Sequence, residues 1–139
     1  MWWQIHCISG GLAVTLGAFG AHSLKTRVKD IKLLDVWDTA VKYHFVHSLV
    51  GLLATLPTHP AFVSAMRHSG AQQMPIAKWA NYFAFIGNVL FSGSLYGIVL
   101  TDIKKLGIIT PFGGLCYIFA WICLASFCDC PNYVFATGS

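Results

Sequence analysis

The chain has 139 residues, of which 56% are hydrophobic and only 10% are charged, and its net charge is +4. Soluble domains carry about 25% charged residues, so this composition excludes an ordinary water-exposed surface. The basic residues lie mostly in short connections, where they act as orientation signals, so we expect no nucleic-acid partner.

Four apolar segments follow one another along the chain. We predict membrane-spanning helices over about residues 2–22, 39–56, 76–100 and 111–127. Each segment has about 17 to 25 residues, the length that one bilayer crossing needs at a rise of about 1.5 Å per residue. The sequence therefore predicts an all-α integral membrane bundle of four transmembrane helices with up-down-up-down topology, in a single domain over residues 1–139.

The connection after the first segment is rich in charge. Within it Val28, Ile31 and Leu34 are three residues apart among basic residues. This spacing favours a short amphipathic helix lying on the membrane surface. An irregular, solvated connection is the alternative, and the sequence does not separate the two.

Small residues recur along two of the predicted helices. The stretch GAFGAHSLK, residues 17–25, matches neither the phosphate-loop spacing nor the dinucleotide-loop spacing. Small residues four apart instead allow helix backbones to approach closely inside lipid. We therefore predict helix packing through five positions: Ala13, Gly17, Ala21, Gly93 and Gly97.

Basic residues gather in the first and third connections. Lys and Arg in short loops mark the side of the membrane that faces the cytosol or the mitochondrial matrix, so both termini are predicted on the opposite side. Basic residues at a leaflet surface also attract anionic lipids such as cardiolipin. We expect lipid head groups to contact four of these residues: Lys25, Arg27, Lys104 and Lys105.

Six polar residues from the four helices fall in the leaflet next to the basic loops, if the topology is up-down-up-down. They are His22, Tyr43, His47, Ser94, Tyr96 and Thr110. Polar groups at membrane depth need partners, so we expect them to hydrogen-bond to one another across helices. The cluster has two interpretations, a structural one and a functional one.

His44 and His47 lie three apart on one helical face, a spacing that suits a metal ion or haem. The topology places no carboxylate or cysteine beside them, so we expect neither a metal nor a cofactor. Among the cysteines, Cys116 and Cys123 are expected to be buried small apolar residues. Cys128 and Cys130 are expected to be free thiols, because a bridge between residues so close is strained.

Several motifs occur in a recognisable order. They are GAFGAH (residues 17–22), Trp37-Asp38-Thr39-Ala40, Tyr43 followed by His47, LFSGSLY (90–96), LGIITPFGG (106–114) and Trp121. Together they resemble the small four-helix membrane family known as domain of unknown function 423, whose animal members are called transmembrane protein 256. The resemblance covers roughly Gly10 to Leu124. It implies a four-helix membrane bundle and no established activity, and the family usually has glutamine at the position of His44.

Three classes of function remain. The first is a non-catalytic helical subunit packed against other membrane proteins, and the second is a small channel or transporter that uses the polar cluster. The third is a redox or lipid-modifying enzyme, for which no nucleophile has a base at a recognisable spacing. We expect the first class, and no enzyme, because four helices in 139 residues leave little room for a gated path.

The expected setting follows from this class. Respiratory-chain complexes of the mitochondrial inner membrane contain small supernumerary subunits, so the expected partners are other membrane subunits and lipids. Both termini would then face the intermembrane space. A bacterial plasma membrane is the alternative.

Overall fold

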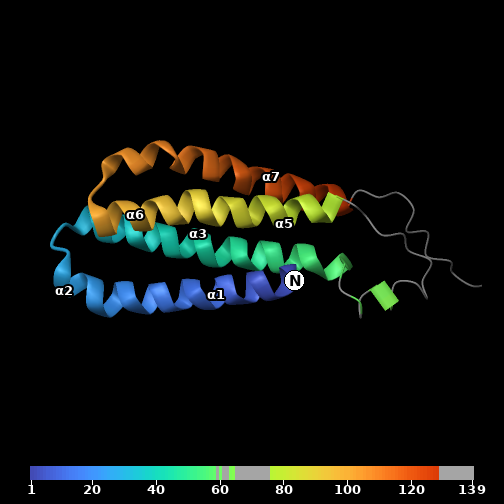
Figure 1. Ribbon diagram of the computed structural model, residues 1–139, viewed down its shortest axis with the longest axis horizontal. Helices are drawn as coiled ribbons and strands as arrows, with labels where there is room; N and C mark the ends of the chain where they lie inside the picture. Colours follow the sequence, from blue (N-terminus) through green and yellow to red (C-terminus); the bar gives the residue numbers. More distant parts are fainter. Residues whose placement is uncertain (59, 61–62, 65–75, 129–139) are drawn as a thin grey trace, which may run out of the picture.

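The computed structural model describes residues 1–58, 60, 63–64 and 76–128. In these ranges every regular element is a helix, and four long helical runs lie side by side with alternating direction (Figure 1). The helix α3 (Ile31–Thr55) packs against α1 (Trp2–Phe19) and α5 (Ile76–Gly87), and α5 packs against α7 (Thr110–Cys128). The predicted all-α class is confirmed.

The first run is longer than predicted. After α1 a π turn, η1 (Gly20–Leu24), leads directly into the short helix α2 (Lys25–Arg27). The run ends at Val28, whose backbone is extended with φ −101° and ψ 114°. The charged residues at its end therefore extend the helix beyond the predicted boundary at residue 22.

The second run begins earlier than the predicted start at residue 39. It begins at Ile31, because Asp30 caps the helix by accepting a hydrogen bond from the Lys32 amide at 3.0 Å. Trp37 is 1% exposed and donates its indole N–H to the carbonyl of Leu16 at 3.0 Å, which holds this part of α3 against α1. The charged connection is thus mostly helix, and no separate surface helix is formed.

The third and fourth runs agree closely with the predicted ranges. A π turn, η3 (Asn88–Ser92), joins α5 to α6 (Gly93–Thr101), and Asp102 ends this run in the left-handed conformation at φ 57°. Asp tolerates this region better than most residues. A short 3₁₀ helix, η4 (Lys104–Ile108), then leads into α7, and another, η2 (Leu56–Thr58), follows α3.

Three of the four runs are long and apolar enough to cross a membrane: Trp2–Arg27, Lys78–Thr101 and Lys104–Ser126. The run α3 does not reach the same hydropathy, because charged residues lie in its first half and Lys42, His44 and His47 lie near its middle. The membrane-spanning character predicted for four helices is therefore met by three. A fourth span through α3 stays a prediction.

The contact between α1 and α3 follows a different face from the predicted one. Ala13 is fully buried, and a Cβ added to Gly17 would lie 3.2 Å from Val41. Ala21, however, is exposed, and Gly20 instead lies against the indole of Trp37. The buried face advances from Ala13 to Gly17 to Gly20, in steps of four and three residues, as expected of a helix with about 3.6 residues per turn.

The predicted packing at Gly93 also needs correction. Gly93 is exposed, because its neighbours Ser92 and Ser94 are the residues that face inward after the π turn. A Cβ on Gly97 would lie 2.8 Å from Leu106, so this glycine faces η4 and not a long helix. The close approach to α7 is made at Gly113, where an added Cβ would lie 2.8 Å from Cα of Phe91.

We predict that Gly113→Ala lowers the free energy of unfolding by about 1–3 kcal/mol, the usual cost of overpacking a tight contact. The obstacle is the backbone of Phe91, which cannot rotate away as a side chain can. Thermal unfolding in detergent, followed by circular dichroism, measures the change. The adjacent Gly114→Ala is the control, since its Cβ would meet Phe91 at an ordinary 3.8 Å. Equal stability of the two variants would contradict this account.

Candidate functional site

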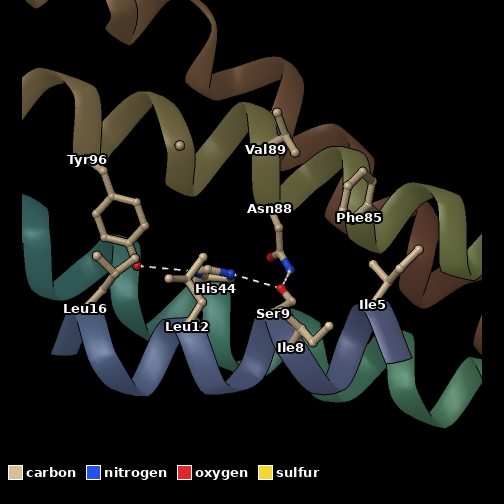
Figure 2. A pocket seen from close by; sticks show the side chains of 11 residues that line it. Ile5, Ile8, Ser9, Leu12, Leu16, His44, Phe85, Asn88, Val89 and Tyr96 are labelled. Atoms are coloured by element: carbon tan, nitrogen blue, oxygen red, sulfur yellow. Dashed lines mark hydrogen bonds between the residues drawn. The ribbon is translucent and has the colours of Figure 1, made fainter. Parts of the chain in front are cut away.

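Polar side chains from α1 and α3 meet inside the bundle. The hydroxyl of Ser9 lies 3.0 Å from Nε2 of His44 and 2.8 Å from the hydroxyl of Ser48. Ser48 also donates to the carbonyl of His44 one turn earlier, at 2.8 Å. Figure 2 shows Ser9 and His44 facing each other across the two helices. This group joins the first two helical runs.

Asn88, at the start of the π turn η3, connects this group to the other two runs. Its side-chain N–H groups donate to Ser9 at 3.3 Å and to Ser48 at 3.2 Å. Its carbonyl oxygen accepts a hydrogen bond from the hydroxyl of Tyr117 on α7 at 2.9 Å. Tyr117 therefore accepts from Ser92, whose hydroxyl lies 3.1 Å away. One amide thus joins all four helical runs.

The network extends from His44 to Tyr96 on α6. Nδ1 of His44 lies 3.3 Å from the Tyr96 hydroxyl. Ser48 gives its only hydroxyl hydrogen to the carbonyl of His44, so Ser9 must donate to Ser48 and accept from Nε2–H of His44. A neutral imidazole carries one N–H and one bare nitrogen, so Nδ1 is the bare nitrogen and accepts from the Tyr96 hydroxyl.

His47 lies on the other side of α3, and only one placement of its ring proton gives both ring nitrogens a hydrogen-bond partner. Its Nδ1 donates to the carbonyl of Tyr43 at 2.9 Å, so Nε2 is bare and accepts from the indole of Trp121 at 3.3 Å. The imidazole also stacks on the ring of Tyr117, with ring centroids 3.4 Å apart. If Nε2 were also protonated, its N–H would point at the N–H of Trp121, and the hydrogen bond between them would be lost. The surroundings therefore hold His47 neutral and in place.

The six residues predicted to form one cluster divide into separate groups. Tyr43 and His47 lie together, and Thr110 donates to Ser94 at 2.7 Å, because Ser94 itself donates to the carbonyl of Phe91. Tyr96 belongs to the His44 network described above, and His22 is exposed on η1. His22 joins none of these groups, since the buried face of this run passes through Gly20 and Leu24 instead.

Sequence reasoning missed the residues at the centre of the network. They are Ser9, His44, Ser48, Asn88, Ser92 and Tyr117. One signal was available: His44 and Ser48 are four apart, as are Asn88 and Ser92, so each pair shares a helix face inside an apolar segment.

A third buried histidine lies toward the other end of the bundle. His6 is 1% exposed, stacks on Trp2 with ring centroids 5.9 Å apart, and lies where a side chain on Gly51 would otherwise stand. Nearby, Asn81 donates to the carbonyl of Ala54 at 3.2 Å. Polar residues therefore continue along the interior beyond the four-helix network. His59 and His68 lie outside the described residues.

A cavity of about 540 Å³ opens sideways between α1 and the run α5–η3–α6, and we call it the lateral groove. Its apolar walls are formed by Ile5, Ile8, Leu12 and Leu16 on one side and by Phe85, Val89 and Gly93 on the other. The line from Tyr96 through His44 and Ser9 to Asn88 crosses its floor (Figure 2). The groove thus combines apolar walls with a few converging polar groups, as small-molecule sites do.

His44 and His47 do not share a ligand site, because each bonds to partners on different helices. Among the described residues, no three His, Cys, Asp or Glu side chains gather at one point. Cys116 and Cys123 are half-buried free thiols, while Cys130 lies outside the described ranges. Lys25 and Arg27 are the first and last residues of α2, and Lys104 and Lys105 begin η4. All four are exposed, and both elements lie at the same end of the bundle (Figure 1).

We predict that Asn88→Ala destabilises the bundle by about 1–3 kcal/mol, because it leaves buried hydroxyls without a partner. Chemical unfolding in detergent measures the loss. Ser126→Ala is the control: that serine is exposed and bonds only to the carbonyl of Ile122 in its own helix, so its loss should cost little. If both substitutions cost the same, Asn88 is not the junction of the four runs.

Comparison with known proteins places the chain among membrane proteins. It is 47% identical over 115 residues to a UPF0382 membrane protein of Bacillus subtilis, YwdK, covering 83% of this chain and 85% of the relative. It is 41% identical to a UPF0382 membrane protein of Staphylococcus aureus, covering 81% of this chain and 82% of the relative. It is 34% identical to one of Schizosaccharomyces pombe, covering 86% and 93% respectively.

No solved structure matches the chain. The family model described as a protein of unknown function (DUF423) matches residues 16–114, which include His44, Asn88 and Tyr96 of the network but not Ser9 or Tyr117. With this match and these relatives, the expected resemblance is confirmed, and the chain belongs to the DUF423 family of UPF0382 membrane proteins.

Proposed function

We propose that the chain is a non-catalytic integral membrane protein that acts as an accessory subunit of a larger membrane complex. The observation that carries this proposal is the complete hydrogen bonding of Asn88, which uses both its donors and its acceptor on other helices. His47 likewise uses both ring nitrogens within the bundle. Groups engaged in this way stabilise the fold and are not held ready for a reaction.

The outer surface supports the same proposal. Large apolar side chains such as Leu53, Ile118 and Phe119 are about half exposed on α3 and α7. In a bilayer such faces contact lipid or the helices of other subunits, which associate mainly through van der Waals packing. The four exposed basic residues at one end would contact anionic head groups such as those of cardiolipin.

The proposed setting is the mitochondrial inner membrane, in a respiratory-chain assembly, with the basic end toward the matrix. Both termini would then face the intermembrane space. The relatives from bacteria and from a fission yeast fit this proposal, since a mitochondrial inner membrane corresponds to a bacterial plasma membrane. In bacteria the equivalent place is the plasma membrane.

A small proton channel is the second candidate function, favoured by one observation. The hydrogen-bonded line from Tyr96 through His44 to Ser9 runs along the helices (Figure 2). The accessory role is better supported, because the line ends at the amide of Asn88, which cannot pass a proton on without leaving Tyr117 unsatisfied.

We predict that the native protein, extracted in a mild detergent, migrates on a native gel far above the size expected for its own 15.2 kDa. Mass spectrometry of the band should identify other membrane proteins, which a harsher detergent should release. The comparison of the two detergents is the internal control. Migration as the isolated chain, or as copies of it alone, in the mild detergent would contradict the accessory role.

We also predict no proton flux through the purified protein in liposomes that contain a pH-sensitive dye. Wild type and His44→Phe should both match protein-free liposomes, because the interior bonds serve the fold. A protonophore added at the end shows that the dye responds. Flux in the wild type that His44→Phe abolishes would establish the channel and remove the accessory proposal.

A further inference from the structure

One face of α3 stays exposed after the other described helices have packed against it. Residues such as Trp37, Ala40 and Gly51 are buried on its inner face. On the opposite face, exposed residues recur at spacings of three and four, which is the spacing of a single helix face. They are Asp35, Asp38, Lys42, Val46, Leu49 and Leu53, and we call them the outer stripe.

The register of α3 against α7 shows how deep Lys42 lies. The two helices run in the same direction (Figure 1), and His47 bonds to Trp121. Lys42 comes five residues before His47, so it is about level with Cys116, which comes five residues before Trp121. Cys116 lies near the middle of the span Lys104–Ser126. Lys42 is therefore exposed close to the middle of the membrane.

The register of α3 against α1 agrees. His44 bonds to Ser9, which lies inside the first span, and Lys42 comes two residues before His44, about 3 Å away along the axis. Asp38 lies about 6 Å and Asp35 about 10 Å closer to the basic end of the bundle. The hydrocarbon core of a bilayer is about 30 Å thick. Asp35 thus approaches the head groups, whereas Asp38 and Lys42 lie within the core.

Lipid is a poor neighbour for these two charges. Ionisable residues at such depth usually face the interior of a bundle or pair with one another. In the part of the chain that the structure describes, neither Asp38 nor Lys42 forms an ion pair. A lysine side chain can carry its ammonium group toward water, but its four-carbon stem is too short to reach the surface from the middle of the core. The outer stripe therefore requires a polar partner from another chain.

We propose that the outer stripe is the contact between two copies of this chain, related by a two-fold axis along the membrane normal. The basic ends of both copies lie on the same side, so their α3 helices run parallel. Side chains lean toward the N-terminus of their helix, so Lys42 of each copy leans one turn toward the level of Asp38 of the other. Two equivalent ion pairs then form, and Val46 and Leu49 pack against their counterparts beside them.

Charge complementarity favours a second copy as the partner. The stripe carries an acid and a base one turn apart, so it is its own complement in a parallel pair. A subunit of different sequence would have to supply the same two charges at matching depths. The contact goes beyond the proposed accessory role and does not depend on it, since the purified chain alone tests the contact.

Energy transfer in liposomes measures the association. Two batches of the purified full chain, one with a donor dye and one with an acceptor dye on a carboxyl-terminal tag, are reconstituted together in phosphatidylcholine. We expect transfer that persists when the lipid is increased about tenfold and that excess unlabelled chain abolishes. Transfer that falls with lipid as for randomly distributed molecules would overturn the proposal.

Charge exchange tests the stripe itself. Asp38→Lys gives a copy two bases and Lys42→Asp gives a copy two acids, so each variant alone places like charges together and should associate about tenfold more weakly. A mixture of the two variants restores both ion pairs and should recover the transfer. Lys32→Asp is the matched control, because it makes the same change on α3 at an exposed position off the stripe and should leave transfer unchanged.

The contrary outcomes are distinct from these. Undiminished transfer in the single variants, or a mixture no better than either variant alone, would overturn the pairing of Asp38 with Lys42. An equal loss in Lys32→Asp would assign the effect to net charge and remove the stripe. Circular dichroism checks the fold of each variant. If a charge exchange prevents folding, Asp38→Asn and Lys42→Met decide, since both should weaken the transfer and wild-type transfer in either would overturn the contact.

Discussion

A polar group inside an apolar bundle must find its partner within the protein, and Asn88 meets this constraint for four helical runs at once. An amide has donors on one side and an acceptor on the other, so its orientation is determined by what surrounds it. Here the donors face α1 and α3, and the acceptor faces α7. Sliding any run along its neighbour would break a bond that water cannot replace in a membrane. The network therefore specifies the register of the bundle.

The close approach of α7 is part of the same arrangement. A Cβ on Gly87 would lie in the ring of Tyr117, so the missing side chain is what allows that ring to enter and reach Asn88. On its other face the ring stacks on His47, which Trp121 and the backbone hold in one orientation. The position of Tyr117 thus depends on three things together: the space left by Gly87, the stacking on His47 and the hydrogen bond to Asn88.

Hydropathy alone predicted the helical class and the third and fourth runs, because a long apolar segment in lipid must satisfy its own backbone hydrogen bonds and a helix does so. It misplaced the start of α3, since the charged residues after Asp30 lie on one face while Trp37 is buried on the other. The polar cluster was predicted only in part. Ser94 and Thr110 are bonded to each other across helices as predicted, but Tyr96 and His47 bond to His44 and Trp121, outside the predicted six. The central partners, Ser9 and Asn88, lie in segments whose composition is simply apolar. Which polar residues face each other depends on how each helix is rotated about its own axis, and composition carries no information about that rotation.

The two π turns have a consequence for how this chain can change over evolutionary time. A π turn contains one residue more than the α-helical turn it replaces, so it marks a place where a helix has accepted a residue without breaking. Removing one residue from η3 would restore a regular helix and rotate everything after it by about 100°. Ser94 and Tyr96 would then leave the interior together, while Asn88 would keep its place. An insertion or deletion at η1 or η3 during evolution would therefore rotate the part of the helix on one side of the turn and leave the part on the other side unchanged.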